Sequence, residues 1–333
     1  MVRQPMSAIP PLLYPLLKWA AFAIALGCAA AALLGQAGRW NGGLDVLNHF
    51  EPIWLFGAVL AAVVWLAIGR TGWLIPALAS LAVMIALVQI GPELMARRPR
   101  AAVAPGAETL KIIQFNLWHN NVDRQATLRW LLAQNADVVI LEEALGNAEI
   151  VHNLKSVYPY RRTCAGLTYC EIEIFSKRAP LSNGGLIDEL GIPAAWVIYP
   201  GSGGPFAVMG THAVWPLPAA PQQWQSATLA KVLDHLPKDR MIVAGDFNST
   251  PWSFALRRQD RLFGLQRLTH GLASFPARAY PKLNLKAPFP FLPIDQVYAG
   301  KGWRTISVQR GPRLGSDHYP VIVTLQAVGA RAG

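Results

Sequence analysis

Three long stretches of this 333-residue chain contain no charged side chain, and all three lie within the first hundred residues. They occupy residues 19–37, 52–69 and 71–92. Each is about as long as a helix that crosses the hydrocarbon core of a bilayer, which needs roughly 20 residues. A soluble domain would have to bury all three in its interior. We therefore expect a transmembrane region over residues 1–96, with helices at about 12–36, 52–69 and 71–91.

The first stretch also allows a different interpretation, a cleaved signal peptide. Arg3 and Lys18 precede the apolar run, and the small residues Ala29 to Ala32 would suit a cleavage site. A signal peptide would not explain the two stretches that follow directly. Composition also favours the membrane, because charged residues make up 15% of the chain, against roughly a quarter in soluble domains.

A basic segment at residues 97–100 and an Ala/Pro/Gly stretch end the apolar region, and neither helical nor strand periodicity is present there. We expect a linker at 97–107, a soluble domain at 108–328 and a tail at 329–333. The first hundred residues hold 7 of the 30 Lys and Arg and 3 of the 19 Asp and Glu, which leaves a formal charge near +7. That charge suits an anionic substrate or a membrane surface.

Two observations conflict about which side of the membrane holds the soluble domain. With three spans, the flanking basic residues slightly favour a cytoplasmic domain: Arg39, Arg97, Arg98 and Arg100 against Arg3, Lys18 and Arg70. Cys164 and Cys170 lie six positions apart around a glycine, which is typical of a small disulfide-closed hairpin in an oxidising compartment. Two unrelated thiols are the alternative. We expect the extracytoplasmic side, because a difference of one charge is weak evidence.

The soluble domain opens with a β-α-β pattern. A short apolar strand is expected at 111–116, an amphipathic helix at 124–134 and a fully buried strand at 138–141. The pattern recurs as a strand at 206–211, a helix at 222–236 and a strand at 241–244. The domain is therefore predicted to be an α/β domain.

Polar side chains stand where the predicted strands end, which is where layered α/β folds place ligands and catalytic groups. Several of these side chains are carboxylates or amides, whose oxygens suit Mg²⁺ or Mn²⁺, and the sequence has no Cys/His cluster for zinc. The residues, in chain order, are Asn116, Glu142, Glu143, His212, Asp246, Asn248, Asp295, Asp317 and His318.

The order and local setting of these residues resemble the endonuclease/exonuclease/phosphatase family, which includes pancreatic-type deoxyribonuclease, abasic-site endonucleases, inositol polyphosphate phosphatases and bacterial sphingomyelinases. The resemblance runs from about residue 111 to 325. Its motifs are Lys-Ile-Ile-Gln-Phe-Asn116, Val-Val-Ile-Leu-Glu-Glu143, Gly-Thr-His212 followed by Trp215-Pro216, Val-Ala-Gly-Asp246-Phe-Asn248-Ser-Thr-Pro, Pro-Ile-Asp295-Gln-Val and Gly-Ser-Asp317-His318-Tyr-Pro.

The resemblance implies a four-layer α/β sandwich, with two central β-sheets flanked by helices, here preceded by three transmembrane helices. It implies an Mg²⁺ or Mn²⁺ cofactor held by Asn116, Glu143 and Asp317. It also implies that Asp246 orients the attacking water and that Asp295 pairs with His318. Asn248 and His212 are the residues expected to contact the phosphate.

This chain departs from the family pattern in two places, and one family residue is ambiguous. Glu142 stands where the family usually has Gln, so it either tightens metal binding or points away. Trp118 stands where abasic-site endonucleases carry an extra Asp, which weakens a DNA-repair interpretation. The family Glu that supports His212 corresponds to Glu171 or to Glu173. The alternative for each of the two is a surface residue.

These features predict a membrane-anchored metal-dependent phosphoesterase of the bacterial type, multi-pass in the inner membrane, that hydrolyses a phosphodiester or phosphomonoester. The partners are the lipid bilayer and a phosphoester that is lipid-linked, soluble or part of a nucleic acid, and the membrane region favours the lipid-linked one. A membrane-tethered nuclease acting on DNA or RNA is the alternative that the basic charge supports. A non-catalytic membrane binding protein is less consistent with a complete set of motif residues. The sequence identifies no protein partner.

Overall fold

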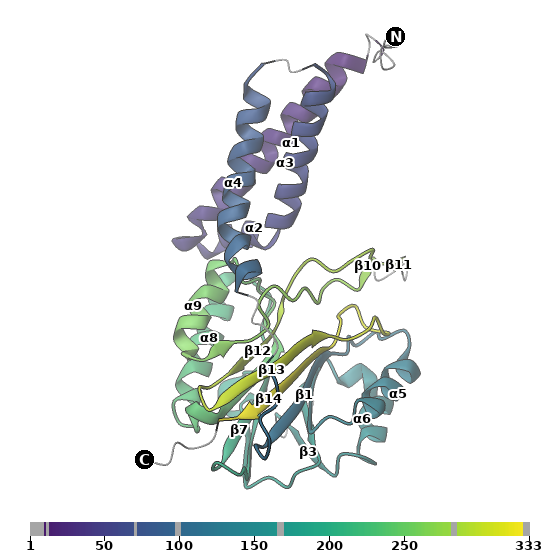
Figure 1. Cartoon of the computed structure of the whole chain (residues 1–333), viewed down its shortest axis with the longest axis vertical. Helices are drawn as coiled ribbons and strands as arrows, with labels where there is room; N and C mark the ends of the chain where they lie inside the picture. Colours follow the sequence, from purple (N-terminus) through teal and green to yellow (C-terminus); the bar gives the residue numbers. More distant parts are fainter. Residues whose placement is uncertain are drawn as a thin grey trace. The chain divides into compact units, whose positions relative to one another are not determined.

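The computed structural model describes residues 10, 13–69, 72–96, 101–164, 170–280 and 285–328. Two compact units make up the described chain, a helical unit that ends at Met95 and an α/β unit that contains most of the remainder (Figure 1). Residues 97–100 of the expected linker and the expected tail at 329–333 lie outside the described residues, as do Arg3 and Arg70.

Three long helices form the first unit, at the positions where transmembrane helices were expected. They are α1 (Leu13–Gln36), α3 (Glu51–Ala67) and α4 (Leu74–Met95), with the short η1 (Ala37–Arg39) and α2 (Gly42–His49) between the first two. Two helices, Leu13–Arg39 and Leu74–Met95, are long and apolar enough to cross a membrane. A third span exists if α2 and α3, which meet at a bend of 59°, count as one. The helix α2 was not predicted.

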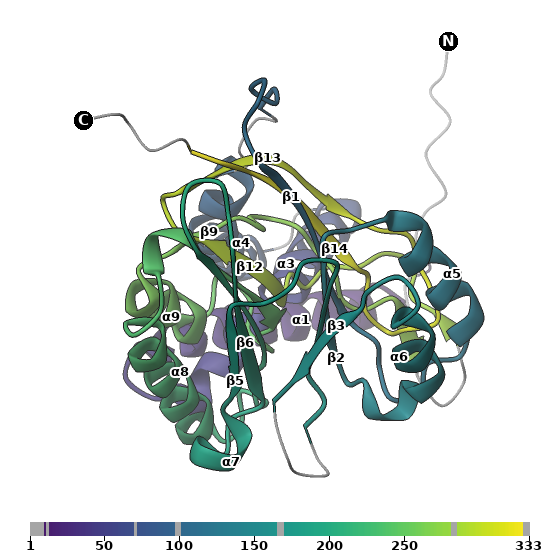
Figure 2. The ribbon, with the colours of Figure 1, turned by 90° about the horizontal axis from the view of Figure 1, so that it is seen from below.

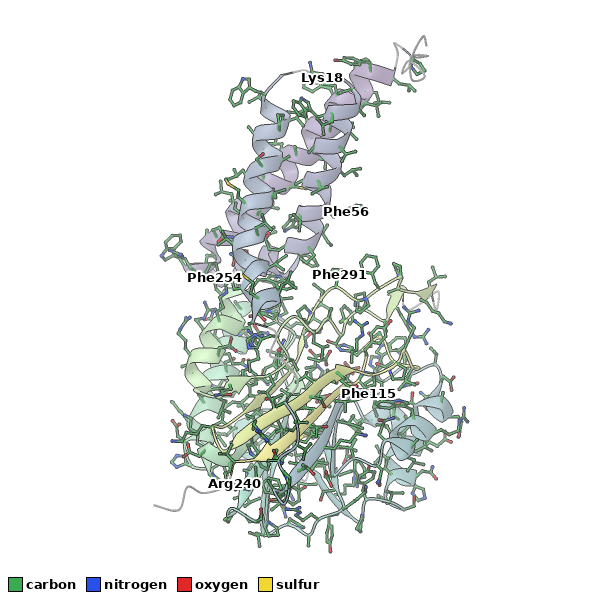
Figure 3. All side chains as sticks on the ribbon, in the orientation of Figure 1. Lys18, Phe56, Phe115, Arg240, Phe254 and Phe291 are labelled. Atoms are coloured by element: carbon green, nitrogen blue, oxygen red, sulfur yellow. A yellow bond between two sulfur atoms is a disulfide. The ribbon has the colours of Figure 1, made fainter. Side chains whose placement is uncertain are left out.

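The helical unit buries its small residues and exposes its large apolar ones. Ala32, Ala61 and Ala82 have no exposed surface. Phe56 is 70% exposed and projects from the bundle (Figure 3), and Val88 is 73% exposed. Small residues allow helix backbones to approach closely, and that packing is typical where the surrounding solvent is itself apolar. The distribution therefore supports a lipid environment for this unit.

The first sheet of the α/β unit has six strands in the order β13-β14-β1-β2-β4-β3. Their bounds are β1 (Thr109–Asn116), β2 (Val138–Glu142), β3 (Tyr160–Thr163), β4 (Glu173–Ser176), β13 (Trp303–Arg310) and β14 (Val321–Ala327). Only β1 and β2 pair in parallel, and they do so through the expected crossover helix α5 (Arg124–Gln134).

The second sheet also has six strands, in the order β5-β6-β7-β8-β12-β9. Their bounds are β5 (Ser182–Gly185), β6 (Ala194–Tyr199), β7 (Phe206–His212), β8 (Met241–Asp246), β9 (Gln266–Arg267) and β12 (Asp295–Ala299). Here β7 and β8 are the parallel pair. A separate hairpin consists of β10 (Arg278–Tyr280) and β11 (Leu285–Lys286).

The two sheets pack face to face with helices on both outer faces, so the predicted four-layer sandwich is confirmed (Figure 2). Along β1, Ile112 faces the other sheet, whereas Ile113 and Phe115 face the helical layer, as the two-residue repeat of a strand requires. The outer layers contain α5, α6 (Ala148–Leu154) and η2 (Leu145–Asn147) on one side, and α7 (Ile187–Leu190), α8 (Ala219–Leu233), α9 (Phe254–Phe263) and η3 (Lys238–Arg240) on the other.

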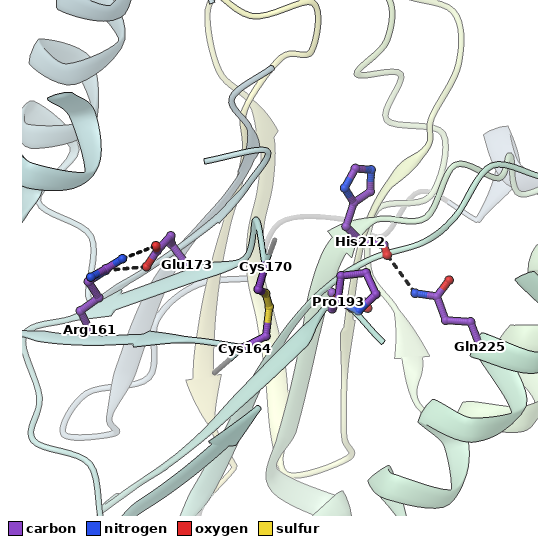
Figure 4. Close-up of a disulfide and its surroundings, with 8 residues drawn as sticks. Arg161, Cys164, Cys170, Glu173, Pro193, His212 and Gln225 are labelled. Atoms are coloured by element: carbon purple, nitrogen blue, oxygen red, sulfur yellow. Dashed lines mark hydrogen bonds and ion pairs between the residues drawn. A yellow bond between two sulfur atoms is a disulfide. The ribbon is translucent and has the colours of Figure 1, made fainter. Parts of the chain in front are cut away.

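A disulfide joins Cys164 to Cys170 between β3 and β4, with the two Cα atoms 5.7 Å apart (Figure 4). Both cysteines are buried against the core between the sheets. The bond expected from the spacing is therefore present, and it closes the chain around a loop of which residues 165–169 lie outside the described residues.

Replacing both cysteines by alanine is expected to lower the free energy of unfolding of the α/β unit by about 2 kcal/mol, because a loop of this length gains conformational freedom in the unfolded chain. Thermal unfolding of the full chain in detergent, monitored by circular dichroism, measures the change. The matched variant Cys28→Ala removes the free, buried cysteine of the helical unit, and it should leave the transition of the α/β unit where it was. Equal transitions in the double variant and the parent would contradict the prediction.

Candidate active site

The pairing of the strands brings the predicted polar strand ends to one edge of the sandwich. Asn116 lies beside Glu142 in the parallel pair β1–β2. His212 lies beside Asp246 in the parallel pair β7–β8. Because β12 runs antiparallel to β8, the first residue of β12, Asp295, also lies beside Asp246. The ends of both sheets therefore present their side chains toward one place.

Three residues at this edge have a left-handed backbone conformation. The φ angles are 56° at Trp118 after β1, 51° at Glu143 after β2 and 47° at Asn248 after β8. Among the described non-glycine residues, the one other positive φ belongs to Asn135, which ends α5. Such conformations are costly for side chains with a Cβ, and they concentrate where a structure aims particular groups at a ligand.

Asp246 is buried at the centre of the cluster, with its side chain 2% exposed. The backbone N–H of Asn248 donates to its Oδ1 at 2.8 Å, and the Asn116 amide donates to its Oδ2 at 3.1 Å. The Nε2 atoms of His212 and His318 each lie 3.6 Å from the same Oδ2. Burial raises the pKa of Asp246, and the positive charge of His318 opposes that rise.

Asp295 and His318 form a buried carboxylate–imidazole pair, with Asp295 Oδ2 2.8 Å from His318 Nδ1. The other oxygen, Oδ1, accepts a hydrogen bond from the amide of Gln114 at 2.8 Å. Burial alone would lower the pKa of His318, but the negative charges of Asp295 and Asp246 outweigh it and raise that pKa well above its usual value. The two carboxylates therefore favour the cationic form of the imidazole.

Glu143 stands at the more open side of the cluster. Its Oε1 accepts a hydrogen bond from the Asn116 amide at 3.0 Å, and its Oε2 lies 3.2 Å from the backbone N–H and 3.0 Å from Nδ1 of His119. Burial raises the pKa of Glu143, but the hydrogen bonds from Asn116 and His119 outweigh it, so the pKa is lowered. Glu143 is therefore an ionised carboxylate, a ligand that suits a hard divalent cation.

The other predicted residues surround this centre. Asn248 donates its amide to Ala213 O at 2.8 Å and lies 3.3 Å from His212 Nε2. Asp317 is half-buried, and burial, together with the nearby charge of Glu143, raises its pKa. The Ser316 hydroxyl donates to Asn116 O at 2.7 Å, and this bond holds the loop that carries Asp317 and His318 against the end of β1.

The tightest His/Asp/Glu group among the described residues is Asp246, Asp295 and His318, whose ligand atoms lie within 4.8 Å of one another. It differs from the metal set expected from the sequence, Asn116, Glu143 and Asp317. Asp295 Oδ2 lies 2.8 Å from His318 Nδ1 and Asp246 Oδ2 lies 3.6 Å from His318 Nε2, so carboxylate–imidazole pairing accounts for this group. The Glu143 side of the cluster fits a metal better.

Glu142, which replaces the usual Gln, points between the two sheets and has no exposed surface. The Gln114 amide donates to its Oε2 at 2.9 Å and also to Asp295, so one amide links the two acids. Burial and the charge of Asp295 raise the pKa of Glu142 well above its usual value. Burial therefore favours the neutral form of this interior carboxyl group.

The two alternatives for the residue that supports His212 occupy different environments. Glu173 is buried on β4 and forms an ion pair with Arg161 (Figure 4). Glu171 is half-buried, and its pKa is raised by burial and by Glu143, with His212 and His119 opposing. Glu171 is therefore the glutamate near the cluster. The orientation of His212 is also fixed through its backbone, because Gln225 donates to its carbonyl oxygen at 2.8 Å (Figure 4).

Sequence reasoning missed two residues of this cluster, His119 and Gln114. The signal for His119 was the polar run His119-Asn120-Asn121 directly after a strand that ends in a site residue. Gln114 gave a weaker signal, a single polar residue at an inward position of an otherwise apolar strand.

Residues 113–318 match the model of the Endonuclease/Exonuclease/phosphatase family. The chain belongs to the endonuclease/exonuclease/phosphatase family. It is accordingly a divalent-metal-dependent hydrolase of phosphoric esters. No curated protein sequence matches the chain.

Solved structures of several proteins share the fold of the α/β unit. Sphingomyelinase C from Streptomyces griseocarneus is 20% identical, with a TM-score of 0.50 over 66% of this chain and 100% of that one. TDP2 of D. rerio, solved with a single-strand DNA product, is 18% identical, with a TM-score of 0.53 over 66% and 99%. Beta toxin from Staphylococcus aureus, solved with bound magnesium ions, is 15% identical, with a TM-score of 0.50 over 66% and 100%.

Proposed function

We propose that this protein is a membrane-anchored phosphodiesterase that hydrolyses a lipid-linked substrate by in-line attack of an activated water. A phosphomonoester is the alternative substrate. The observation that carries the proposal is the convergence on buried Asp246 of two imidazoles and two amide N–H donors from both sheets. We propose the domain boundaries that were expected from the sequence, with the helical region at 1–96 and the catalytic domain at 108–328.

The proposed metal ligands are Glu143, Asn116 and Asp317, and the proposed ion is Mg²⁺ or Mn²⁺. When bound, such an ion polarises a non-bridging phosphate oxygen and offsets developing negative charge. Hydrogen bonds from Asn116 and His119 keep Glu143 ionised and oriented toward the open side of the cluster. The magnesium ions bound to the similarly folded beta toxin support this assignment.

The residues around Asp246 have complementary proposed roles. Asp246 orients the water and accepts its proton, and the Asn248 N–H fixes the carboxylate at 2.8 Å. His318, kept cationic by Asp295, donates a hydrogen bond to the phosphate as charge develops on it. His212 and the Asn248 amide, 3.3 Å apart, contact the phosphate from the β7–β8 side.

The substrate proposal rests on the apolar helical unit, because a membrane anchor concentrates the enzyme where lipid-linked esters lie. The likeness to a sphingomyelinase supports a lipid substrate. The formal charge near +7 of the soluble part and the likeness to a protein solved with a DNA product favour the second candidate, a membrane-tethered nuclease.

The two candidates are separated by a hydrolysis panel on the purified full chain with added Mg²⁺ or Mn²⁺. The substrates are a chromogenic phosphodiester, a chromogenic phosphomonoester, plasmid DNA, single-stranded RNA and phospholipid vesicles. We expect metal-dependent release from the generic diester and from vesicles. Cleavage of nucleic acid with inert vesicles would replace the lipid proposal with the nuclease, and no hydrolysis of any ester would overturn both.

The catalytic domain is proposed to lie on the extracytoplasmic side of a bacterial-type inner membrane. The disulfide supports this placement, because reducing compartments do not maintain such bonds. Cells expressing the chain are quenched with acid and denatured, and free thiols are labelled with a maleimide of high mass. Of the three cysteines, we expect only Cys28 to react before reduction, and labelling of all three without reductant would place the domain in the cytoplasm.

A further inference from the structure

The side chain of His119 is 57% exposed, yet both of its ring nitrogens are occupied. Nδ1 lies 3.0 Å from Glu143 Oε2, and Nε2 lies 2.8 Å from the Asn120 amide. Holding an exposed imidazole in one orientation costs rotamer entropy. Contacts between the turn that carries His119 and the turn that carries Glu143 offset this cost.

Two contacts join these turns. The Asn147 amide donates to Trp118 O at 3.0 Å and to Glu143 O at 3.1 Å, so one side chain spans both backbones. Gly146 lies so close to His119 that a Cβ at position 146 would be 2.1 Å from the His119 carbonyl oxygen. Together with the left-handed backbone of Trp118 and Glu143, these contacts fix the imidazole beside the carboxylate.

One distance at Glu143, from its Oε2 to His119 Nδ1, matches the edge of a metal coordination shell. In an octahedral site with bonds of about 2.1 Å, neighbouring donor atoms lie about 3 Å apart. The separation from Glu143 Oε2 to His119 Nδ1 is 3.0 Å, whereas the 3.0 Å contact of Glu143 Oε1 is a hydrogen bond from the Asn116 amide N–H.

We propose that His119 binds the catalytic metal ion through Nδ1, which gives the site a mixed nitrogen and oxygen donor set. This inference rests on the proposed function, in which Glu143 binds the metal. Coordination through Nδ1 replaces the hydrogen bond from Nδ1 to Glu143 and requires the proton on Nε2, and the Asn120 amide, turned to present its oxygen, accepts that proton's hydrogen bond. Because an imidazole donor suits transition metals better than Mg²⁺, the site is expected to prefer Mn²⁺.

The test compares the full chain with His119→Asn, which places an amide nitrogen near the position of Nδ1. That variant retains a hydrogen-bond donor to Glu143 and removes the imidazole. Pulsed electron paramagnetic resonance of bound Mn²⁺ should show directly coordinated imidazole nitrogen in the parent and none in His119→Asn. Affinity for Mn²⁺ should fall about tenfold in the variant while affinity for Mg²⁺ changes by less than about twofold. The matched control, His152→Asn, changes an exposed histidine on α6 and should behave as the parent.

The outcomes separate this inference from the proposed function. Absence of nitrogen coupling in the parent, or equal coupling in His119→Asn, overturns the role of His119. If Glu143→Gln abolishes Mn²⁺ binding in the same experiment, the proposed metal site still stands. If the parent binds Mn²⁺ no better than Glu143→Gln, the proposed metal site itself is wrong.

Discussion

Replacing Asp246 with asparagine is expected to lower kcat for a chromogenic phosphodiester by about 10³-fold, the range expected for loss of a general base. The variant keeps the size of the side chain and an acceptor oxygen for the Asn248 N–H, which donates at 2.8 Å. It removes the negative charge that lies 3.6 Å from both imidazoles. Steady-state kinetics of the full chain in detergent, with saturating metal, measures the change.

The same substitution should leave the fold intact, because His318 remains paired with Asp295, 2.8 Å from its Nδ1, when the charge of Asp246 is removed. Thermal unfolding of the variant should therefore match that of the parent. Asp239→Asn is the matched control, since Asp239 is 66% exposed and pairs with Lys301 at the surface, 3.1 Å away. Near-parental turnover in Asp246→Asn, with the control unchanged, would remove Asp246 from the proposed mechanism.

Much of the fold follows from local pattern in the sequence. The uncharged stretches predict α1, α3 and α4 because bilayer thickness fixes helix length. The fully apolar run of β2 predicts a strand that is buried on both faces. The short helix α2 escaped prediction because its eight residues, Gly42–His49, include Asp45, Asn48 and His49 and carry no long apolar repeat.

The sequence motifs single out the residues that meet in the candidate site, whereas the connections between those residues were not predicted. Asn116, Asp246 and Asp295 each follow or begin an apolar strand, so their convergence at one edge follows from strand direction. The amide of Gln114 links Glu142 to Asp295. Gln114 and Asp295 are 181 positions apart in the sequence. Only the packing of the two sheets brings those groups together, and no local pattern contains that information.

The expected behaviour of His318→Ala follows from such a connection. The imidazolium lies between Asp295 at 2.8 Å and Asp246 at 3.6 Å, with 5% of its side chain exposed. Its removal takes away the proposed phosphate donor and should lower kcat by about 10³-fold. It also leaves two buried carboxylates without their cation, and breaking a buried ion pair in this way costs about 3 kcal/mol.

The loss of stability in His318→Ala should depend on pH with a defined sign. The pKa of His318 is raised in the folded state above its usual value of 6.5. Its stabilising contribution is therefore complete below about pH 6.5 and is lost as pH rises through the folded-state pKa. Urea unfolding of the full chain in detergent at pH 6 and pH 9 should therefore show a larger difference between parent and variant at pH 6. A deficit that is equal at the two pH values would mean that His318 contributes packing rather than charge.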